Sequence, residues 1–511
     1  MGRTIAYQPE LSPTLPTVVG NVDYAEFEAT LSRVQEILDI SGVEQAFVEH
    51  RLEAYEIEAR ARAIEAGKAP REISSRELGH VVKQALQGLR CNIARELTGE
   101  DCRTFSTHLA ESALLRHFCL IDGIHPIRVP SKSTIDRYSR LVPQGLVREV
   151  VDQLTRTATG IDSGSSHPLG LAKALDMDAY FLDSTCVKAN IHFPTDWVLL
   201  RDATRTLMRS ILVIRSHGLK HRIEAPETFI TKMNRLSIAM TQAGRKKDDG
   251  KERKRVLRLM NKLMATVRNH AVRYRQLLQE RWPETLLSQK QAEQILKRMD
   301  AVLEVLPQAI EQAKERIVRG RQVANPEKIL SLYEPDIHVV VRGKAGAKVE
   351  FGNVLFLGET PEGVIVDWKL VKDRVPSDAT WVRETLERYG RIVDRFPSAL
   401  ATDRGFDAPE NRAFLSEQNI YNAICPKSIP RLREKLSEDS FVTLQKRRAQ
   451  TEARVGIFQN GFLGKPMRSK GFLHRESNVA WAVLAHNLWV LARLKTLAQL
   501  QEEEQRSKKA A

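Results

Sequence analysis

The stretch AYFLDSTCVKANIHFPTD, residues 179–196, decides the fold. Aromatic and β-branched side chains are frequent in it, and this composition predicts an extended segment over residues 178–193. Asp183 directly follows the apolar residues that open the segment. Helical periodicity precedes the segment along the chain and resumes after it. The pattern therefore predicts a buried strand that carries an acidic residue between two largely helical regions.

Two later stretches carry an acidic residue in a comparable setting. SALATDRGFDAPENRAF, residues 398–414, places Asp403 at the end of another short apolar run. LQKRRAQTEARVGIFQNGF, residues 444–462, places Glu452 in a strongly basic helical pattern. Two strand ends and one helix face would bring the three carboxylates together. Such a group suits phosphoryl transfer with two divalent ions, which lie roughly 3.5–4 Å apart in sites of this kind.

Composition limits the classes of protein to consider. The chain has 511 residues, 42% of them hydrophobic and 28% charged, and Lys plus Arg (79) exceed Asp plus Glu (64) by 15. This length predicts three or four domains, and the positive charge favours a polyanionic partner. No apolar run approaches the roughly 20 residues of a membrane span, and the first residues lack the apolar core of a signal peptide. We therefore expect a cytoplasmic protein without membrane contact.

Cysteine usage excludes two further classes of site. The five cysteines are scattered and form no CxxC pair, so neither a zinc site nor a redox pair is predicted.

Changes in periodicity and composition along the chain predict its organisation. The expected units are a flexible N-terminus (1–22), a helical N-terminal DNA-binding domain (23–160), a catalytic domain in two pieces (176–195 and 336–495), a basic helical insertion (196–335) and a charged C-terminal tail (496–511). The insertion is too long for a surface loop, so we expect it to form a domain of its own. Asp196 at its start is expected to cap the first helix of this domain.

The N-terminal region contains a candidate helix-turn-helix. Residues 106–120 predict one helix, and a second follows from Ser131 or Ser133, either of which suits a helix cap. A helix-turn-helix places its second helix in the DNA major groove. Two packed surface helices would give the same pattern, so both interpretations stay open.

The densest positive charge lies between residues 245 and 275, where twelve Lys or Arg face three acids. Contacts to phosphates supply most of the salt-dependent affinity for DNA, which favours a surface that follows a DNA backbone. A solvated helix face with a flexible loop is the alternative. The residues expected to contact DNA here are Arg245, Lys246, Lys247, Lys251, Arg253, Lys254 and Arg255.

The part after the insertion alternates strands and helices. Strands are predicted over 337–341, 348–357, 364–371, 399–403 and 420–425, and helices over 379–396, 408–418 and from 442 onward. With the first strand added, this is the ribonuclease H-like order, in a mixed, helix-rich α/β fold. The acids Asp367, Asp373 and Asp378 after the third strand are expected to form turns.

The three acidic phrases resemble those of DDE-type insertion-sequence transposases, and in particular the ISNCY-like group. The resemblance covers about residues 105–495 and implies that Asp183, Asp403 and Glu452 are catalytic and hold two Mg²⁺ ions, with Mn²⁺ a workable substitute. It further implies cleavage of transposon ends and joining of the freed 3′-hydroxyl to target DNA. The implied partners are double-stranded DNA, both terminal inverted repeats and target, and further copies of the chain in a dimer or larger assembly, associated with the nucleoid.

Cations surround the candidate site. Arg404 adjoins Asp403, and the helix of Glu452 also carries basic residues that would steer a phosphate: Lys446, Arg447, Arg448 and Arg454. Gln445 and Gln459 stand where a related group of transposases has Tyr and Lys, which weakens any expectation of a hairpin-forming mechanism. Two alternatives remain, a ribonuclease H-like nuclease without strand transfer and a non-catalytic DNA-binding protein.

Overall fold

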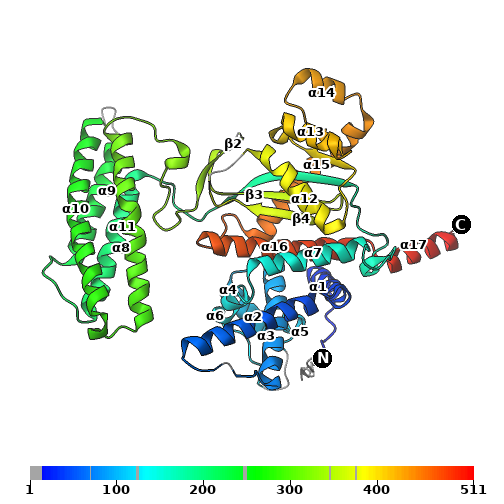
Figure 1. The fold of residues 1–511 in the computed structure, drawn as a ribbon, viewed down its shortest axis with the longest axis horizontal. Coiled ribbons are helices and arrows are strands. Elements are labelled where there is room, and N and C mark those ends of the chain that lie inside the picture. Colours follow the sequence, from blue (N-terminus) through cyan, green and yellow to red (C-terminus); the bar gives the residue numbers. More distant parts are fainter. Residues whose placement is uncertain are drawn as a thin grey trace.

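The computed structural model describes residues 14–69, 71–121, 126–244, 250–344, 347–373 and 377–510. The fold is a mixed, helix-rich α/β fold, as predicted, and a six-stranded sheet lies at its centre (Figure 1). The strands are β1 (Ala179–Lys188), β2 (His338–Lys344), β3 (Ala347–Glu359), β4 (Ile365–Leu370), β5 (Ala399–Thr402) and β6 (Tyr421–Ile424). β1 is shorter than the predicted extended segment, because the chain leaves the sheet after Lys188.

The sheet joins an antiparallel half to a parallel half. β1 pairs antiparallel with β3 and parallel with β5, and β6 adds a further parallel strand beside β5. β2 and β4 share the other edge of β3: Gly352 pairs with both β1 and β2, and Leu357 pairs with both β1 and β4. The parallel pairing of β1 with β5 sets the first two candidate acids at matching positions, as described below.

Helices fill the region before the sheet. They are α1 (Val22–Ser41), α2 (Val43–Glu65), α3 (Ser75–Thr98), α4 (Cys102–Glu111), α5 (Ala113–Phe118), α6 (Lys132–Tyr138) and α7 (Gln144–Thr159). The helix predicted over 106–120 is divided at Ser112, whose side chain caps α5. Ser131 caps α6 by accepting a hydrogen bond from the Thr134 N–H. The turn of the candidate helix-turn-helix falls at residues 122–125, outside the described residues.

The segment after β1 forms a four-helix bundle that stands to one side of the sheet (Figure 1). Its helices are α8 (Asp196–Ser216), α9 (Pro226–Ala243), α10 (Gly250–Arg281) and α11 (Gln289–Ile317), and they enclose a hydrophobic cluster of their own. Asp196 was expected to cap α8, but Thr195 is the cap residue and Asp196 is the first residue of the helix. Its buried carboxylate instead accepts hydrogen bonds from Gln312 (2.9 Å) and Arg316 (2.9 Å) of α11.

The remaining helices lie between or after the last strands of the sheet. They are α12 (Trp381–Val393), α13 (Pro409–Glu417), α14 (Ile429–Lys435), α15 (Asp439–Ile457), α16 (Phe472–Arg493) and α17 (Leu497–Ala510), and a π-helical segment (Phe458–Leu463) follows α15. Successive side chains of a strand point to opposite faces. Tyr180 of β1 bonds to Thr385 of α12 at 2.9 Å, and Phe181 lies under Arg447 of α15. The two helices therefore cover opposite faces of the sheet.

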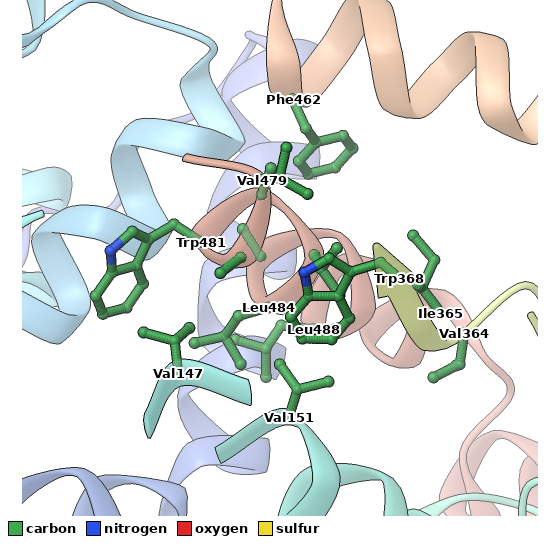
Figure 2. Close-up of a cluster of buried hydrophobic side chains, with 14 of the residues drawn as sticks. Val147, Val151, Val364, Ile365, Trp368, Phe462, Val479, Trp481, Leu484 and Leu488 are labelled. Atoms are coloured by element: carbon green, nitrogen blue, oxygen red, sulfur yellow. The ribbon is translucent and has the colours of Figure 1, made fainter. Parts of the chain in front are cut away.

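α16 runs between the sheet and the N-terminal helices (Figure 1) and is apolar on most of its surface. In Figure 2, Leu484 and Leu488 of α16 lie among Val147 and Val151 of α7 and Trp368 of β4. A single hydrophobic cluster extends from α1 through α16 to the sheet. The predicted domain boundary near residue 160 is therefore not a break in the core. None of the described helices combines the length and the apolar character that crossing a membrane requires.

Candidate active site

The parallel pairing of β1 with β5 aligns two of the predicted acids. The pairs run from Ala179 with Ala399 to Phe181 with Ala401. Continued by two residues, the same register aligns Asp183 with Asp403, which directly follows β5. Neighbouring strands lie about 4.8 Å apart, and side chains in register point to the same face of a parallel sheet. Asp183 and Asp403 therefore occupy matching positions, each two residues beyond the last residues that pair β1 with β5.

The face of β1 that carries Asp183 is the one covered by α15. Phe181, Asp183 and Thr185 are alternate residues of β1, so their side chains point to the same face of the sheet. The guanidinium of Arg447 lies 4.5 Å from the centre of the Phe181 ring, and Gln459 Nε2 donates to Thr185 Oγ1 at 2.8 Å. Since Asp183 lies between Phe181 and Thr185, α15 and the π-helical segment pass directly over it.

The position of Glu452 follows from two glutamines on either side of it in the chain. Gln445 and Glu452 of α15 are seven residues apart, so an ideal helix turns by only about 20° between them, and Gln459 follows in the π-helical segment that continues α15. Gln445 Nε2 donates to Thr402 O (3.1 Å), just before Asp403, and to Ala423 O (2.6 Å). Gln459 Nε2 also donates to Cys186 O (3.0 Å). Glu452 thus lies on the face of α15 that meets the strands, between the contacts to β5 and β1.

Backbone N–H groups orient the two aspartates. Asp403 Oδ1 accepts a hydrogen bond from the Gly405 N–H at 2.8 Å, and Asp183 Oδ1 accepts one from the Ser184 N–H at 2.7 Å. Both carboxylates are partly buried, whereas Glu452 is exposed. Among the residues that the structure describes, no group of three or more His, Cys, Asp or Glu side chains is close enough together to enclose a metal ion.

Asp378 is a further acid beside Asp403, whereas the sequence favoured a role in a turn over a role near the metals. A Cβ atom on Gly405 would lie 2.6 Å from Asp378 Oδ2 and 3.0 Å from Asp403 Oδ1, so the two carboxylates flank the same glycine. Asp378 opens a short 3₁₀ helix instead of only forming a turn. The tertiary approach of residues 378 and 405 leaves no signal in the sequence. Asp367, by contrast, is bound by Arg148 at 2.7 Å and Arg388 at 2.8 Å.

Two of the cations on α15 make hydrogen bonds within the protein. Arg447 donates to the buried Glu359 (3.0 Å) and to Thr360 O (2.9 Å) and Pro361 O (2.7 Å) in the turn between β3 and β4. Arg454 also donates to Pro361 O, at 3.0 Å, and burial lowers the pKa of its guanidinium. The sequence predicted that both arginines present free cations to a phosphate, but in the structure both bond to the turn between β3 and β4. These partners lie about ninety residues away along the chain, so the sequence alone does not show the contacts.

The other expected cations near the site face outward. Lys446 and Arg404 are exposed. Arg448 is partly buried, and its Nε atom has no hydrogen-bond partner among the described residues.

The basic run of the insertion divides into two parts. Arg245, Lys246 and Lys247 lie outside the described residues. On α10, four cations recur at helical spacing on the exposed face: Lys251, Arg255, Arg258 and Lys262. Arg255 pairs with Glu252 at 2.6 Å, and Arg253 lies over the Trp197 ring at 5.6 Å. Lys254 is half-buried.

The π-helical segment after α15 rests on a buried histidine. His486 of α16 contacts the rings of Phe458, Phe462 and Trp489, with centroid distances of 5.2–6.0 Å. Burial among these rings lowers the pKa of His486 to about 4. The imidazole is therefore neutral at pH 7, as its apolar surroundings require.

Comparison of the chain with protein-family models, with curated proteins and with solved structures finds no match. The fold and the candidate site therefore carry the functional argument.

Proposed function

We propose that this chain is a DDE-type DNA transposase that cuts transposon ends and joins them to target DNA. One observation supports the proposal: β1 and β5 pair in parallel up to two residues before Asp183 and Asp403, and α15, the helix of Glu452, is bonded to β5 and β6 through Gln445. Asp183, Asp403 and Glu452 are the type of side chain that two-metal phosphoryl transfer uses, although among the described residues they do not lie close enough together to enclose an ion.

The sheet supports a ribonuclease H-like core. Its strands adjoin in the order β4-β3-β1-β5-β6, with the first three antiparallel and the last two parallel to β1. Asp183 lies on β1, Asp403 directly follows β5, and Glu452 lies on α15, which comes after β6 in the chain. This agrees with the arrangement that the resemblance implies.

The donor set fits hard divalent cations. Asp183, Asp403 and Glu452 offer carboxylate oxygens only, which suits Mg²⁺ or Mn²⁺. Bound ions of this kind would lower the pKa of water and neutralise charge on the phosphate. The chain itself supplies orientation, since the Gly405 and Ser184 N–H groups hold the two aspartates and the two glutamines hold α15 on the strands.

The proposed reaction has two in-line displacements at phosphorus. In the first, the oxygen of water bonds to a phosphorus at the transposon end, and the 3′-oxygen leaves and is protonated to a 3′-hydroxyl. In the second, this hydroxyl loses its proton and bonds to a phosphorus of target DNA, which releases a target 3′-hydroxyl. In this proposal Arg404, Lys446 and Arg448 hold the phosphate, and the exposed cations of α10 hold more distant DNA. Pairing of two transposon ends implies at least a dimer.

The test uses labelled DNA from the ends of the element and a second, unlabelled DNA. We expect Mg²⁺-dependent cleavage by the wild-type protein and joining of the freed 3′-end to the second DNA. Asp403→Asn and Asp183→Asn should abolish both steps and retain DNA binding, because the isosteric amide leaves the fold intact. Asp373→Asn, at an exposed acid after β4, is the matched control.

The outcomes separate the alternatives. Cleavage without joining identifies a nuclease, and DNA binding without cleavage identifies a binding protein. Full cleavage by both Asp→Asn variants rejects the proposed site.

A further inference from the structure

The insertion joins the sheet at a cavity that the candidate active site does not use. This cavity has a volume of about 390 Å³, within the range of ligand sites, and lies between the chain that leaves β1 and the first turns of α8. Two aromatic residues with large exposed surfaces line it, Phe193 (72% exposed) and Tyr333 (51% exposed). Exposed aromatic side chains at a cavity mark a binding surface more often than scattered apolar residues do.

Both rings are fixed at one side and open at the other. Phe193 packs edge-on against Phe351, with ring centroids 5.6 Å apart. The Tyr333 hydroxyl bonds to Thr206 Oγ1 at 2.6 Å and donates to Asp202 O at 3.2 Å, both on α8. Because these contacts hold the rings in place, a flat ligand would stack on them without first ordering them.

A row of arginines follows the same wall of the cavity. Arg201, Arg205 and Arg209 are four residues apart on α8, which puts them on one face with a rise of about 6 Å between neighbours. Arg201 pairs with Asp202 at 3.1 Å. Arg205 and Arg209 are exposed, and neither has a carboxylate partner among the described residues. The wall therefore offers two cations to successive charges of a linear polyanion.

The cavity continues toward the N-terminal helices. Asn190 and Lys470 line both this cavity and a larger one of about 880 Å³. The larger cavity adds further cations, Lys132, Lys465 and Arg468, although acids such as Glu100 and Asp136 also line it. The two cavities therefore adjoin at Asn190 and Lys470.

We infer that this cavity, at the junction of α8 with the sheet, binds an unpaired strand of DNA. Cations that track a backbone, together with aromatic faces that stack on bases, form the combination by which proteins hold single strands. A duplex keeps its bases stacked on one another and offers no base face to Phe193. The choice of DNA as the polyanion rests on the proposed function, and the inference adds that the substrate has an unpaired segment beside the core.

Fluorescence anisotropy without divalent ions tests the inference, using a short fluorescein-labelled single strand and the corresponding blunt duplex. We expect the wild-type protein to retain the single strand at salt concentrations that release the duplex. Phe193→Ala should weaken binding of the single strand about tenfold and leave duplex binding unchanged, and Phe193→Trp should restore it. Leu286→Ala, at an exposed leucine of the same bundle, is the matched control.

The arginines are tested by salt dependence. Replacing both Arg205 and Arg209 by Ala should lower the slope of log affinity against log salt by about 1.4 for the single strand. Arg383→Ala, on the exposed side of α12, should leave the slope unchanged. All of these positions are exposed, so thermal unfolding is expected to match the wild-type protein and to verify folding.

Three results would overturn the inference. They are wild-type affinity of Phe193→Ala for the single strand, an equal loss for the duplex, and displacement of the strand by polyglutamate as effectively as by unlabelled strand. Cleavage of end DNA is measured separately, so the two proposals fail in different ways. Intact cleavage with no strand preference rejects the unpaired-strand site alone, whereas strand binding by a wild-type protein that does not cleave rejects the proposed function alone.

Discussion

Gln459 joins the helix of one candidate catalytic acid to the strand of another. Its Nε2 atom donates to Thr185 Oγ1 at 2.8 Å and to Cys186 O at 3.0 Å, two and three residues beyond Asp183, while Glu452 lies two helical turns before it. Gln459 is buried, so its amide has no competing water. The distance between Asp183 and Glu452 thus depends on the hydrogen bonds of Gln459, which is a neutral residue.

We predict that Gln459→Leu lowers both stability and the cleavage rate. The substitution leaves a buried hydroxyl and a buried carbonyl without their donor, which costs about 1–3 kcal/mol of unfolding free energy. Urea unfolding measures this loss, and single-turnover cleavage should slow while DNA affinity stays the same. Gln450→Leu, at an exposed position of α15, is the control. Equal behaviour of the two variants would contradict the prediction.

Stability should depend on pH through His486. Its pKa is about 4 in the folded protein and about 6.5 when unfolded, so between these values only the unfolded chain binds the proton. The contribution of His486 is therefore fully present above pH 6.5 and is lost as pH falls toward 4, by roughly 3 kcal/mol.

The substitution His486→Phe keeps a ring among its aromatic neighbours and removes the titration. We expect the unfolding free energy of this variant, measured in urea from pH 4 to 8, to rise less steeply with pH than that of the wild-type protein. Parallel curves for the two proteins would show that His486 is protonated in the folded state.

Arg447 and Lys446 should separate stability from DNA binding. Arg447→Met removes the nearer of the two cations beside the buried Glu359 and leaves Arg454 at 3.8 Å, so the loss of its hydrogen bonds should cost about 1–3 kcal/mol of unfolding free energy. Lys446→Met changes an exposed side chain and should leave stability within about 0.5 kcal/mol. Chemical denaturation and DNA titrations of both variants test this. Weakened DNA binding in a fully stable Arg447→Met protein would speak against the structural role.

The exposed cations of α10 should hold DNA through its phosphates. The triple variant Lys251→Ala, Arg258→Ala, Lys262→Ala is expected to lower the salt slope of duplex binding by roughly 2–3. A triple of equal charge on α11 of the same bundle, Lys290→Ala, Lys297→Ala, Arg298→Ala, is the control. An unchanged slope in the α10 variant would place the DNA on another surface.

Local patterns predicted the elements because each element carries its own signal. The apolar run before Asp403 became β5, but β1 continues past Asp183 to Lys188, so Asp183 lies within its strand and not, as was predicted, at the end. The strands predicted over 348–357 and 364–371 became β3 and β4 with small shifts at their ends. Burial of alternate or helically spaced apolar residues determines such elements, so the sequence shows them directly.

Side-chain partners were not predictable, because they depend on the approach of distant segments. Arg447 finds Glu359 and Asp378 meets Asp403 only once the sheet has formed. The basic composition of α15 predicted a surface that steers a phosphate, but Arg447 of this helix pairs with the buried Glu359 instead. The aromatic cavity at Phe193 was likewise hidden, since Phe193 and Tyr333 are 140 residues apart.

The position of α16 in the core bears on the order in which the chain folds. Trp481 of α16 packs against Phe47 of α2 at 5.7 Å and donates to Ser139 O at 3.0 Å, although the ribosome makes it more than 300 residues later. The helices made first therefore keep apolar surface exposed until α16 has been synthesised. A nascent chain of this kind depends on chaperones for longer than one whose N-terminal part folds alone.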